Sequence, residues 1–363
     1  MKHRAIRPPA RWSRRHMMTL LARAGLAIVA LPGLAATSRA AAQPIFYTWP
    51  SDDNADLVAE FTRTHDAPPV VQVFQDENEA FQQLRKGLTV DVAHPCADQF
   101  AHWRAAGLLQ PIDTGRLANW PDLFPTLSRL GTGENGQQWF VPFDWGTTSV
   151  AYRADLVDIA SESYDLLWND RYAGKLAFGT DATESVIIAG LVAGVADPFN
   201  MTDDELTRVR AILMRQKPLL SFYWSDLELV AEGLVSGALV ASTAWNEIVP
   251  LVQGRGCDIR FMNPKEGMLG WCCGFVLTRA ATEVDLAYEL IDSLLSPATG
   301  KVLTSLGVAH SNRRVFETVS AETLAGLGLP YGPDDMLANS VFLRPSPRMA
   351  EYQSIFDEVV GDA

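Results

Sequence analysis

The sequence lacks the short motifs on which several large classes of enzyme depend. It contains no G-x-S-x-G, no Walker A loop and no G-x-G-x-x-G directly after a predicted strand. There are only six histidines, and no two of them have the H-x-x-x-H spacing of a helical zinc site. These absences argue against a serine hydrolase, a P-loop nucleotide hydrolase and a zinc enzyme. We therefore expect no catalytic residues, no resident metal and no cofactor.

Basic residues are also scarce. Lysine and arginine together number 30 against 43 aspartates and glutamates, which gives a formal net charge of −13. Residues 1–42 hold Lys2 and seven arginines but no acid, so the rest of the chain is more acidic still. An acidic surface repels nucleic acids and attracts cations. We expect no nucleic-acid partner.

The N-terminal apolar run is too short for the roughly 20 residues that a membrane-spanning helix needs. It follows the basic residues 1–15, is interrupted by Arg23 and Pro32, and leads into small residues. This order is typical of a signal peptide. We predict that residues 1–42 are one, cleaved near Ala40 to Ala42, and that the mature protein is periplasmic.

The route of export is indicated by the pair Arg14-Arg15. Ser13 precedes the pair and two methionines follow it at the offset expected for a twin-arginine signal. An ordinary secretory signal with incidental arginines is the alternative.

Strands and helices alternate through the first hundred residues of the mature chain. The expected strands are 44–49, 69–75 and 89–95, and the expected helices are 53–65, 77–87 and 97–107. This βαβαβα order predicts a parallel sheet flanked by helices. A second α/β unit begins at 139–156, which we interpret as strand, turn, strand. No Ser/Gly-rich linker separates the two units.

Tryptophans and carboxylates recur at the predicted strand ends. Ligands of open α/β sheets bind beyond the carboxyl ends of the strands, which draws attention to the following residues: Thr48, Trp49, Cys96, Asp98, Asp144, Trp145, Asp181, Glu184, Trp245 and Trp271. Indole faces and carboxylates both attract a cation, so this set predicts an amine-binding cleft. Taken alone, Asp181 has the simpler interpretation of a helix cap.

Several stretches resemble, in order and spacing, the periplasmic spermidine/putrescine-binding proteins of ABC transporters. The most specific are VPFDWGTTSVAYR (141–153) and NPKEGMLGW (263–271), and the resemblance covers essentially the whole mature chain. It implies an α/β, two-lobed periplasmic-binding-protein fold in which each lobe is a mixed sheet flanked by helices and the lobes are joined by crossover strands.

The resemblance also implies where the lobes divide and what the protein meets. We place lobe 1 at 43–147 plus 272–316 and lobe 2 at 148–271 plus 317–363. A polyamine or a related cationic amine is expected in the cleft, and a permease in the inner membrane is the expected partner of a monomeric protein. A binding protein for a different solute, with a retuned cleft, and an exported enzyme are the alternatives.

Two positions depart from the family pattern. Cys273 stands where the family has an aspartate that anchors one end of the amine, and Val308 stands where a tyrosine is expected. Trp245 and Trp271 match the two cleft tryptophans, and Asp181 with Glu184 matches the acidic pair of the second lobe. Asp98 and Asp144 are the candidates to replace the missing anchor; the alternatives are a diamine or triamine bound at one end, or a smaller or different cationic solute.

The adjacent cysteines Cys272 and Cys273 lie in a predicted strand. Side chains alternate along a strand, so Cys273 should face the cleft and Cys272 the other way. A disulfide between neighbours is not expected. Three outcomes remain open for Cys273: a disulfide with Cys96, a soft-metal site completed by His94 or His310, or burial as a small apolar residue.

Overall fold

Three short parallel strands begin the part of the chain that the computed structural model describes. That part is 42–363 without 134, 321–323, 325–327, 330–332 and 362–363, so the predicted signal peptide lies outside it apart from Ala42. The strands are β1 (Ile45–Thr48), β2 (Val70–Val73) and β3 (Val92–Ala93), in the order β2-β1-β3. The helices that follow these strands are α2 (Ala59–His65), α3 (Glu77–Arg85) and α4 (Phe100–Ala105). The predicted βαβαβα unit is confirmed.

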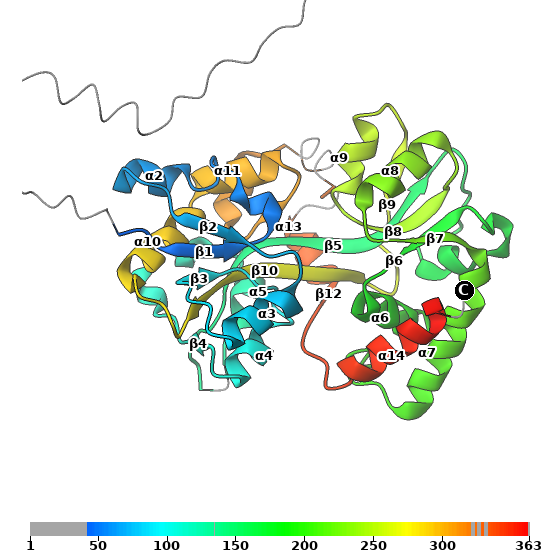
Figure 1. Cartoon of the computed structure of the whole chain (residues 1–363). Helices are drawn as coiled ribbons and strands as arrows, with labels where there is room; N and C mark the ends of the chain where they lie inside the picture. The colour runs from blue at the N-terminus through cyan, green and yellow to red at the C-terminus, as the bar shows by residue number, and fades with distance from the viewer. Residues whose placement is uncertain (1–41, 134, 321–323, 325–327, 330–332, 362–363) are drawn as a thin grey trace, which may run out of the picture. The chain divides into compact units, whose positions relative to one another are not determined.

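Two long antiparallel strands continue the sheet. They are β5 (Val141–Arg153) and β10 (Met268–Thr278), which lie side by side across the middle of the molecule (Figure 1). At one end β10 pairs with β3, and toward the other end β5 pairs with β8 (Ala241–Trp245). The sheet therefore runs continuously from the first group of strands to the second.

The predicted turn within 139–156 is wrong, because β5 is one unbroken strand. Gly146 suggested a turn, but its role is to allow a close approach. It pairs with Trp271 of β10, and a Cβ atom at this position would clash with the Trp271 ring. A glycine inside a strand often marks such an approach.

The second group of strands completes the sheet in the order β10-β5-β8-β6-β7. Its remaining members are β6 (Leu176–Gly179), β7 (Leu220–Trp224) and β9 (Ile259–Phe261). The helices that follow these strands or cover them are α6 (Ala182–Val192), α7 (Asp203–Gln216), α8 (Leu227–Ser236), α9 (Ile248–Gln253) and α14 (Met349–Gly361). Thr202 and Glu205 form a capping box at the start of α7.

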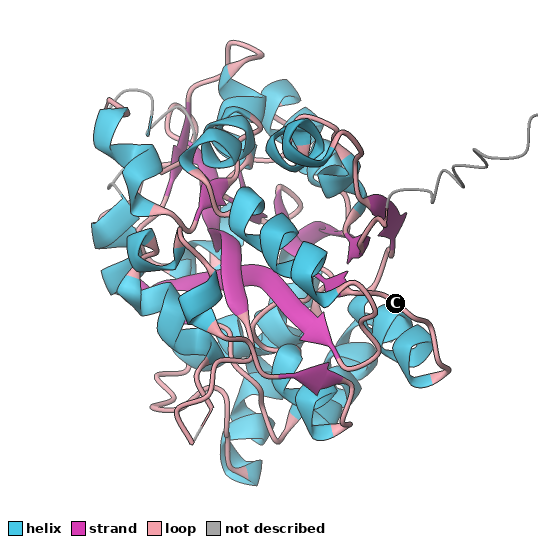
Figure 2. Ribbon diagram, turned by 90° about the vertical axis from the view of Figure 1, so that its left-hand side faces the viewer, coloured by secondary structure: helices cyan, strands magenta, loops and turns pink. Residues whose placement is uncertain are grey.

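The C-terminal third returns to the first group of strands and packs helices on it. These are α10 (Val284–Leu294) and α11 (Pro297–Ser305), with Pro297 in the first helical turn. The short elements are β4 (Leu109–Gln110), α5 (Pro125–Ser128), β11 (Ala309–His310), α13 (Pro333–Asn339) and β12 (Ser340–Phe342). Helices lie on both sides of the strands (Figure 2).

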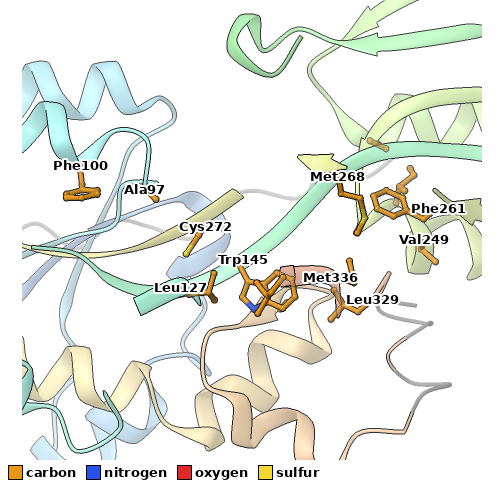
Figure 3. Packing of buried hydrophobic residues seen from close by; sticks show 14 of the residues in the cluster. Ala97, Phe100, Leu127, Trp145, Val249, Phe261, Met268, Cys272, Leu329 and Met336 are labelled. Carbon is orange, nitrogen blue, oxygen red and sulfur yellow. The ribbon is translucent and has the colours of Figure 1, made fainter. Parts of the chain in front are cut away.

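Buried apolar side chains form a cluster in each half and a third that extends along β5 and β10. One contains Phe46 and Phe275, another contains Phe178 and Tyr352, and the third includes Trp145, Cys272 and Met268 (Figure 3). Full burial of one such large side chain contributes about 1.5–3 kcal/mol. The described residues include no helix long and apolar enough to cross a membrane. The residue boundaries of the two lobes remain a prediction.

Candidate functional site

Five carboxylates stand where strands of the sheet end and helices begin. Glu77 is the first residue of α3, Asp98 lies between β3 and α4, and Asp181 caps α6 through a 2.7 Å hydrogen bond from the Glu184 backbone nitrogen. Glu184 is in the first turn of α6, and Glu247 comes directly before α9. We call Glu77, Asp98, Asp181, Glu184 and Glu247 the carboxylate row. Within the described residues none of them pairs with a lysine, an arginine or a histidine.

Burial raises the pKa of the members of the row, and the charges of other members add to the shift at Glu77, Asp98 and Glu184. Burial raises the pKa of Glu184 to about 8, and the charges of Asp181, Asp98 and Glu247 add to this shift. Burial likewise raises the pKa of Glu77 to about 8, with further contributions from Asp98 and Asp181. A cation placed among these groups would relieve both their repulsion and their lost hydration.

The pKa of the other three members is also raised. Burial raises the pKa of Glu247 to about 7, with Asp144 adding to the shift. Neighbouring protein atoms also reduce the hydration of Asp98 and Asp181 and so raise the pKa of both carboxyl groups. Asp181 nevertheless keeps contact with solvent, because it lies beyond the end of its strand. The strands that these residues follow place Glu77 and Asp98 on the β2–β3 side of the sheet, and Asp181, Glu184 and Glu247 on the β8–β6 side.

Three half-buried tryptophans accompany the carboxylates. Trp49 packs against Phe74 with ring centroids 4.6 Å apart, Trp245 meets Trp224 edge to face at 5.2 Å, and Trp271 lies over Gly146. The indole nitrogens of Trp49 and Trp271 are buried and have no hydrogen-bond partner within the described chain.

One carboxylate oxygen of Glu247, Oε2, is buried and unpartnered in the same way. Glu247 also lines a hollow of ≈ 390 Å³ together with Pro250, Leu306 and Gly307. Buried polar atoms without partners are costly, so a ligand that paired with Glu247 and the two indoles would offset that cost. A larger hollow of ≈ 530 Å³ near Tyr288 is lined by none of these residues.

A second polar network connects residues at the ends of β1 and β3 with Asp144 of β5. His94 is fully buried, with Nδ1 3.0 Å from Asp52 and Nε2 3.0 Å from Asp144. The Thr48 hydroxyl donates to Asp52 at 3.0 Å and lies 2.9 Å from His94 Nδ1. Burial opposes a charge on His94, but Asp144 and Asp52 outweigh it and raise its pKa to about 10. His94 is therefore an imidazolium held between two carboxylates.

This network decides between the two candidates for the missing anchor. Burial raises the pKa of Asp144, and its pairing with His94 lowers it in part. The Asp144 carboxylate already has the His94 imidazolium as its cationic partner. Asp98, by contrast, accepts only a 2.7 Å bond from the neutral Gln99 amide. Asp98 thus remains available to a cationic ligand.

Cys96 and Cys273 form a disulfide that joins the β3–α4 turn to β10. This is one of the three outcomes left open for Cys273. Cys272 faces the other way, into the core beside Trp145 (Figure 3), which confirms the predicted alternation. His310 is buried with Nε2 3.0 Å from the Leu294 carbonyl. No group of side chains in the described residues is arranged to hold a metal ion.

The disulfide predicts the outcome of thiol titration. Unfolded but unreduced mature protein should react with two equivalents of a thiol reagent, at Cys257 and Cys272, because the other two sulfurs are bonded to each other. After reduction all four cysteines should react. Peptide mapping should recover a fragment pair linked through Cys96 and Cys273, and four reactive thiols before reduction would contradict the assignment.

The structure separates the predicted site residues into three sets. Asp98, Asp181 and Glu184 lie together in the carboxylate row, with Trp49, Trp245 and Trp271 as the half-buried aromatics. Thr48 and Asp144 belong to the His94 network, and Cys96 and Cys273 to the disulfide. Asp181 is also a helix cap, as its simpler interpretation predicted.

Trp145 does not join any of these sets, and its predicted role requires correction. It is fully buried in the core, where its indole donates a 3.0 Å bond to the His310 carbonyl. It follows Asp144 directly in β5, and neighbours in a strand face opposite sides of the sheet. The two residues could not both have lined one surface.

Asp52, Glu77 and Glu247 were not among the predicted ligand-binding residues, and His94 was predicted only as a possible metal ligand. Glu77 and Glu247 follow the ends of β2 and β8, so the rule that ligands bind at carboxyl strand ends applies to them too. Nothing local distinguishes His94, whose partner Asp144 is 50 residues away in sequence.

Comparison with known proteins places these features in context. Residues 56–314 match the family model described as bacterial extracellular solute-binding protein. The putrescine-binding periplasmic protein PotF of Escherichia coli is 27% identical over 343 residues, 88% of this chain and 92% of that protein. The spermidine/putrescine-binding periplasmic protein of the same organism is 26% identical over 282 residues, covering 76% and 80%.

A solved structure is similar over nearly its full length. The spermidine/putrescine ABC transporter substrate-binding protein PotD of Streptococcus pneumoniae superposes with a TM-score of 0.75 at 18% identity, covering 88% of this chain and 99% of that one. At this identity the likeness concerns the fold, and it confirms the predicted fold class.

Proposed function

The chain belongs to the family of bacterial extracellular solute-binding proteins, and on that basis we propose that it binds a polyamine such as putrescine or spermidine in the periplasm and delivers it to an ABC permease. The observation that carries the proposal is the carboxylate row, whose five acids have no cationic partner among the described residues. The polyamine-binding names of the relatives support the choice of ligand.

In this proposal each part of the site has a distinct task. The ammonium groups of the ligand pair with Glu184, Asp181 and Glu247, and the methylene chain lies against the faces of Trp245 and Trp271. A cation near an indole face is attracted by its quadrupole, and this attraction grows as water is excluded. The buried Oε2 atom of Glu247 then gains the partner that it lacks.

Binding by this mechanism releases protons. Glu77 and Glu184, with pKa values raised to about 8 mainly by burial, are largely protonated at neutral pH. An ammonium ion favours the ionised carboxylate and lowers its pKa. The proposed site therefore exchanges protons for the ligand.

The decisive experiment is a titration of mature protein, residues 43–363, with putrescine, spermidine and 1,4-butanediol. Tryptophan fluorescence and melting temperature should respond saturably to both amines, because half-buried indoles flank the carboxylate row. The diol has nearly the length of putrescine but no charge, so it should cause no response. If folded protein shows no change in fluorescence or melting temperature with either amine, or responds equally to the diol, the proposal is contradicted.

A further inference from the structure

We propose that Glu77 is a ligand-contacting residue which, with Asp98, receives the second ammonium group of the amine and so selects diamines over monoamines. The inference rests on the proposed function. The resemblance to the polyamine-binding family predicted no role for Glu77. The inference gives it one, and it states that the number of ammonium groups decides which amines bind.

Glu77 is held in place by its backbone surroundings. Asp76 caps α3 by accepting a 2.9 Å bond from the Glu79 nitrogen, which fixes the first turn of the helix where Glu77 stands. Oε1 of Glu77 then accepts a 2.6 Å hydrogen bond from the Cys96 backbone nitrogen. Oε2 has no hydrogen bond within the described chain. The carboxylate is thus oriented by one oxygen and left open at the other.

The Cys96 nitrogen places this carboxylate beside the disulfide. Cys96 is bonded to Cys273, the position at which an anchoring aspartate was expected and is missing. Glu77 reaches the same place from α3, an element remote in sequence from β10. A carboxyl group absent from one strand is thereby supplied by a helix, and it becomes a carboxylate when an ammonium group binds.

Asp98 supplies the second carboxylate on this side of the sheet. It lies two residues beyond Cys96 in the turn that the disulfide fastens, and its charge acts directly on Glu77. The other three members, Asp181, Glu184 and Glu247, follow β6 and β8, which β10 and β5 separate from β2 and β3 in the sheet. Carboxylates on both sides of these two long strands suit a ligand with separated positive charges better than one with a single charge.

The disulfide has a positioning role in this arrangement. It ties the β3–α4 turn, which holds Asp98 and donates to Glu77, to the long strand β10. Backbone hydrogen bonds from the Ala97 nitrogen to the Cys272 carbonyl (2.8 Å) and from the Gly274 nitrogen to the Pro95 carbonyl (3.0 Å) also join the turn to β10. The disulfide adds a covalent link at the residue whose nitrogen binds Glu77. The sulfurs themselves need not touch the ligand.

The test compares two amines of nearly equal length, putrescine and 1-aminobutane, by calorimetric titration of Glu77→Gln. We expect putrescine affinity to fall about tenfold or more, as for removal of one partner of a charge pair shielded from water, while 1-aminobutane changes by less than about twofold. Glu79→Gln is the matched control, because Glu79 is exposed on the same helix and should leave both affinities unchanged.

Each other outcome has a definite meaning. If the wild type binds putrescine and Glu77→Gln binds it equally well, the inference is overturned and the proposed function stands. An equal loss for both amines would also overturn it, because Glu77 would then act only as a distant charge. If the wild type binds neither amine, the proposed function itself fails.

The positioning role of the disulfide is tested in the Cys96→Ser/Cys273→Ser double variant. Its preference for putrescine over 1-aminobutane should fall, and adding Glu77→Gln should then cause little further loss, since coupled residues are not additive. A preference equal to that of the wild type would rule out the positioning role. Thermal denaturation of the ligand-free variant separates this effect from a loss of folded protein.

Discussion

Glu184→Gln is expected to weaken putrescine binding by about a hundredfold or more. The charges of Asp181, Asp98 and Glu247 all act on Glu184, and the Thr148 hydroxyl donates a 3.0 Å hydrogen bond to its Oε1 atom. Removing one partner of a buried, hydrogen-bonded charge pair costs about 2–5 kcal/mol, and each tenfold change in affinity corresponds to about 1.4 kcal/mol. Calorimetric titration at pH 8 measures the loss directly.

The same substitution should stabilise the ligand-free protein, and this sign distinguishes it from damage to the fold. The pKa of Glu184 is about 8 in the folded chain, raised chiefly by burial from an ordinary 4.5. The folded state therefore retains a proton between about pH 4.5 and pH 8 that the unfolded state has released. The contribution of Glu184 to the free energy of unfolding falls as pH rises through this window.

Glutamine does not titrate, so the stability advantage of Glu184→Gln over the wild type should grow from pH 5 to pH 8.5. Urea denaturation across this range measures it. Glu232→Gln, at an exposed position on α8, is the control for the loss of one acid and should change neither affinity nor stability.

Trp245→Ala should also weaken putrescine binding strongly without unfolding the protein. Unchanged affinity in both Glu184→Gln and Trp245→Ala would refute the site.

His94→Phe is expected to destabilise the protein by about 3–5 kcal/mol, the usual cost of removing one partner from a buried ion pair. The cost arises because Asp52 and Asp144 are left facing each other without the imidazolium that now separates them. The shape of the site changes little, since His94 already packs among the rings of Phe46, Phe143 and Phe275.

The pH dependence of this loss identifies its cause. The pKa of His94 is about 10 when folded, against an ordinary 6.5, because two carboxylates outweigh the effect of burial. Its stabilisation is therefore complete below about pH 6.5 and disappears as pH rises toward 10. The difference between wild type and His94→Phe in urea denaturation should narrow over that interval. Adding Asp52→Asn and Asp144→Asn should recover much of the loss, and a loss that is independent of pH and not recovered would show that only packing was disturbed.

Local patterns in the sequence were sufficient to predict the first group of strands. Period-two strands and short amphipathic helices between 44 and 107 matched β1 to α4 closely because each element is determined by its own residues. The continuous strand β5 was not predictable in this way. Gly146 serves a contact with Trp271, more than a hundred residues along the chain, and a local reading of glycine favours a turn.

Candidate site residues could be predicted where their position at a strand end was sufficient. They could not be predicted where their role depends on residues distant in the sequence. Asp181, Glu184 and Trp245 follow directly from their places at the ends of β6 and β8. The roles of Asp144 and Asp98 could not be separated, because that depends on His94 neutralising one of them. The importance of Glu77 depends on a hydrogen bond from Cys96, 19 residues away.

The pairing of β3 with β10 has a consequence for the order in which the protein is made. Val92 and Leu277 are neighbours in the sheet, yet the ribosome synthesises the whole second group of strands between them. Throughout that time β3 is an open sheet edge with unpaired peptide groups, the kind of surface that other extended chains can join. Strands β7 and β8 each pair with β6 within a shorter stretch of chain. The first group of strands therefore gains its last neighbour only after the second group has been synthesised, and α14 at the end of the chain then packs on the second group.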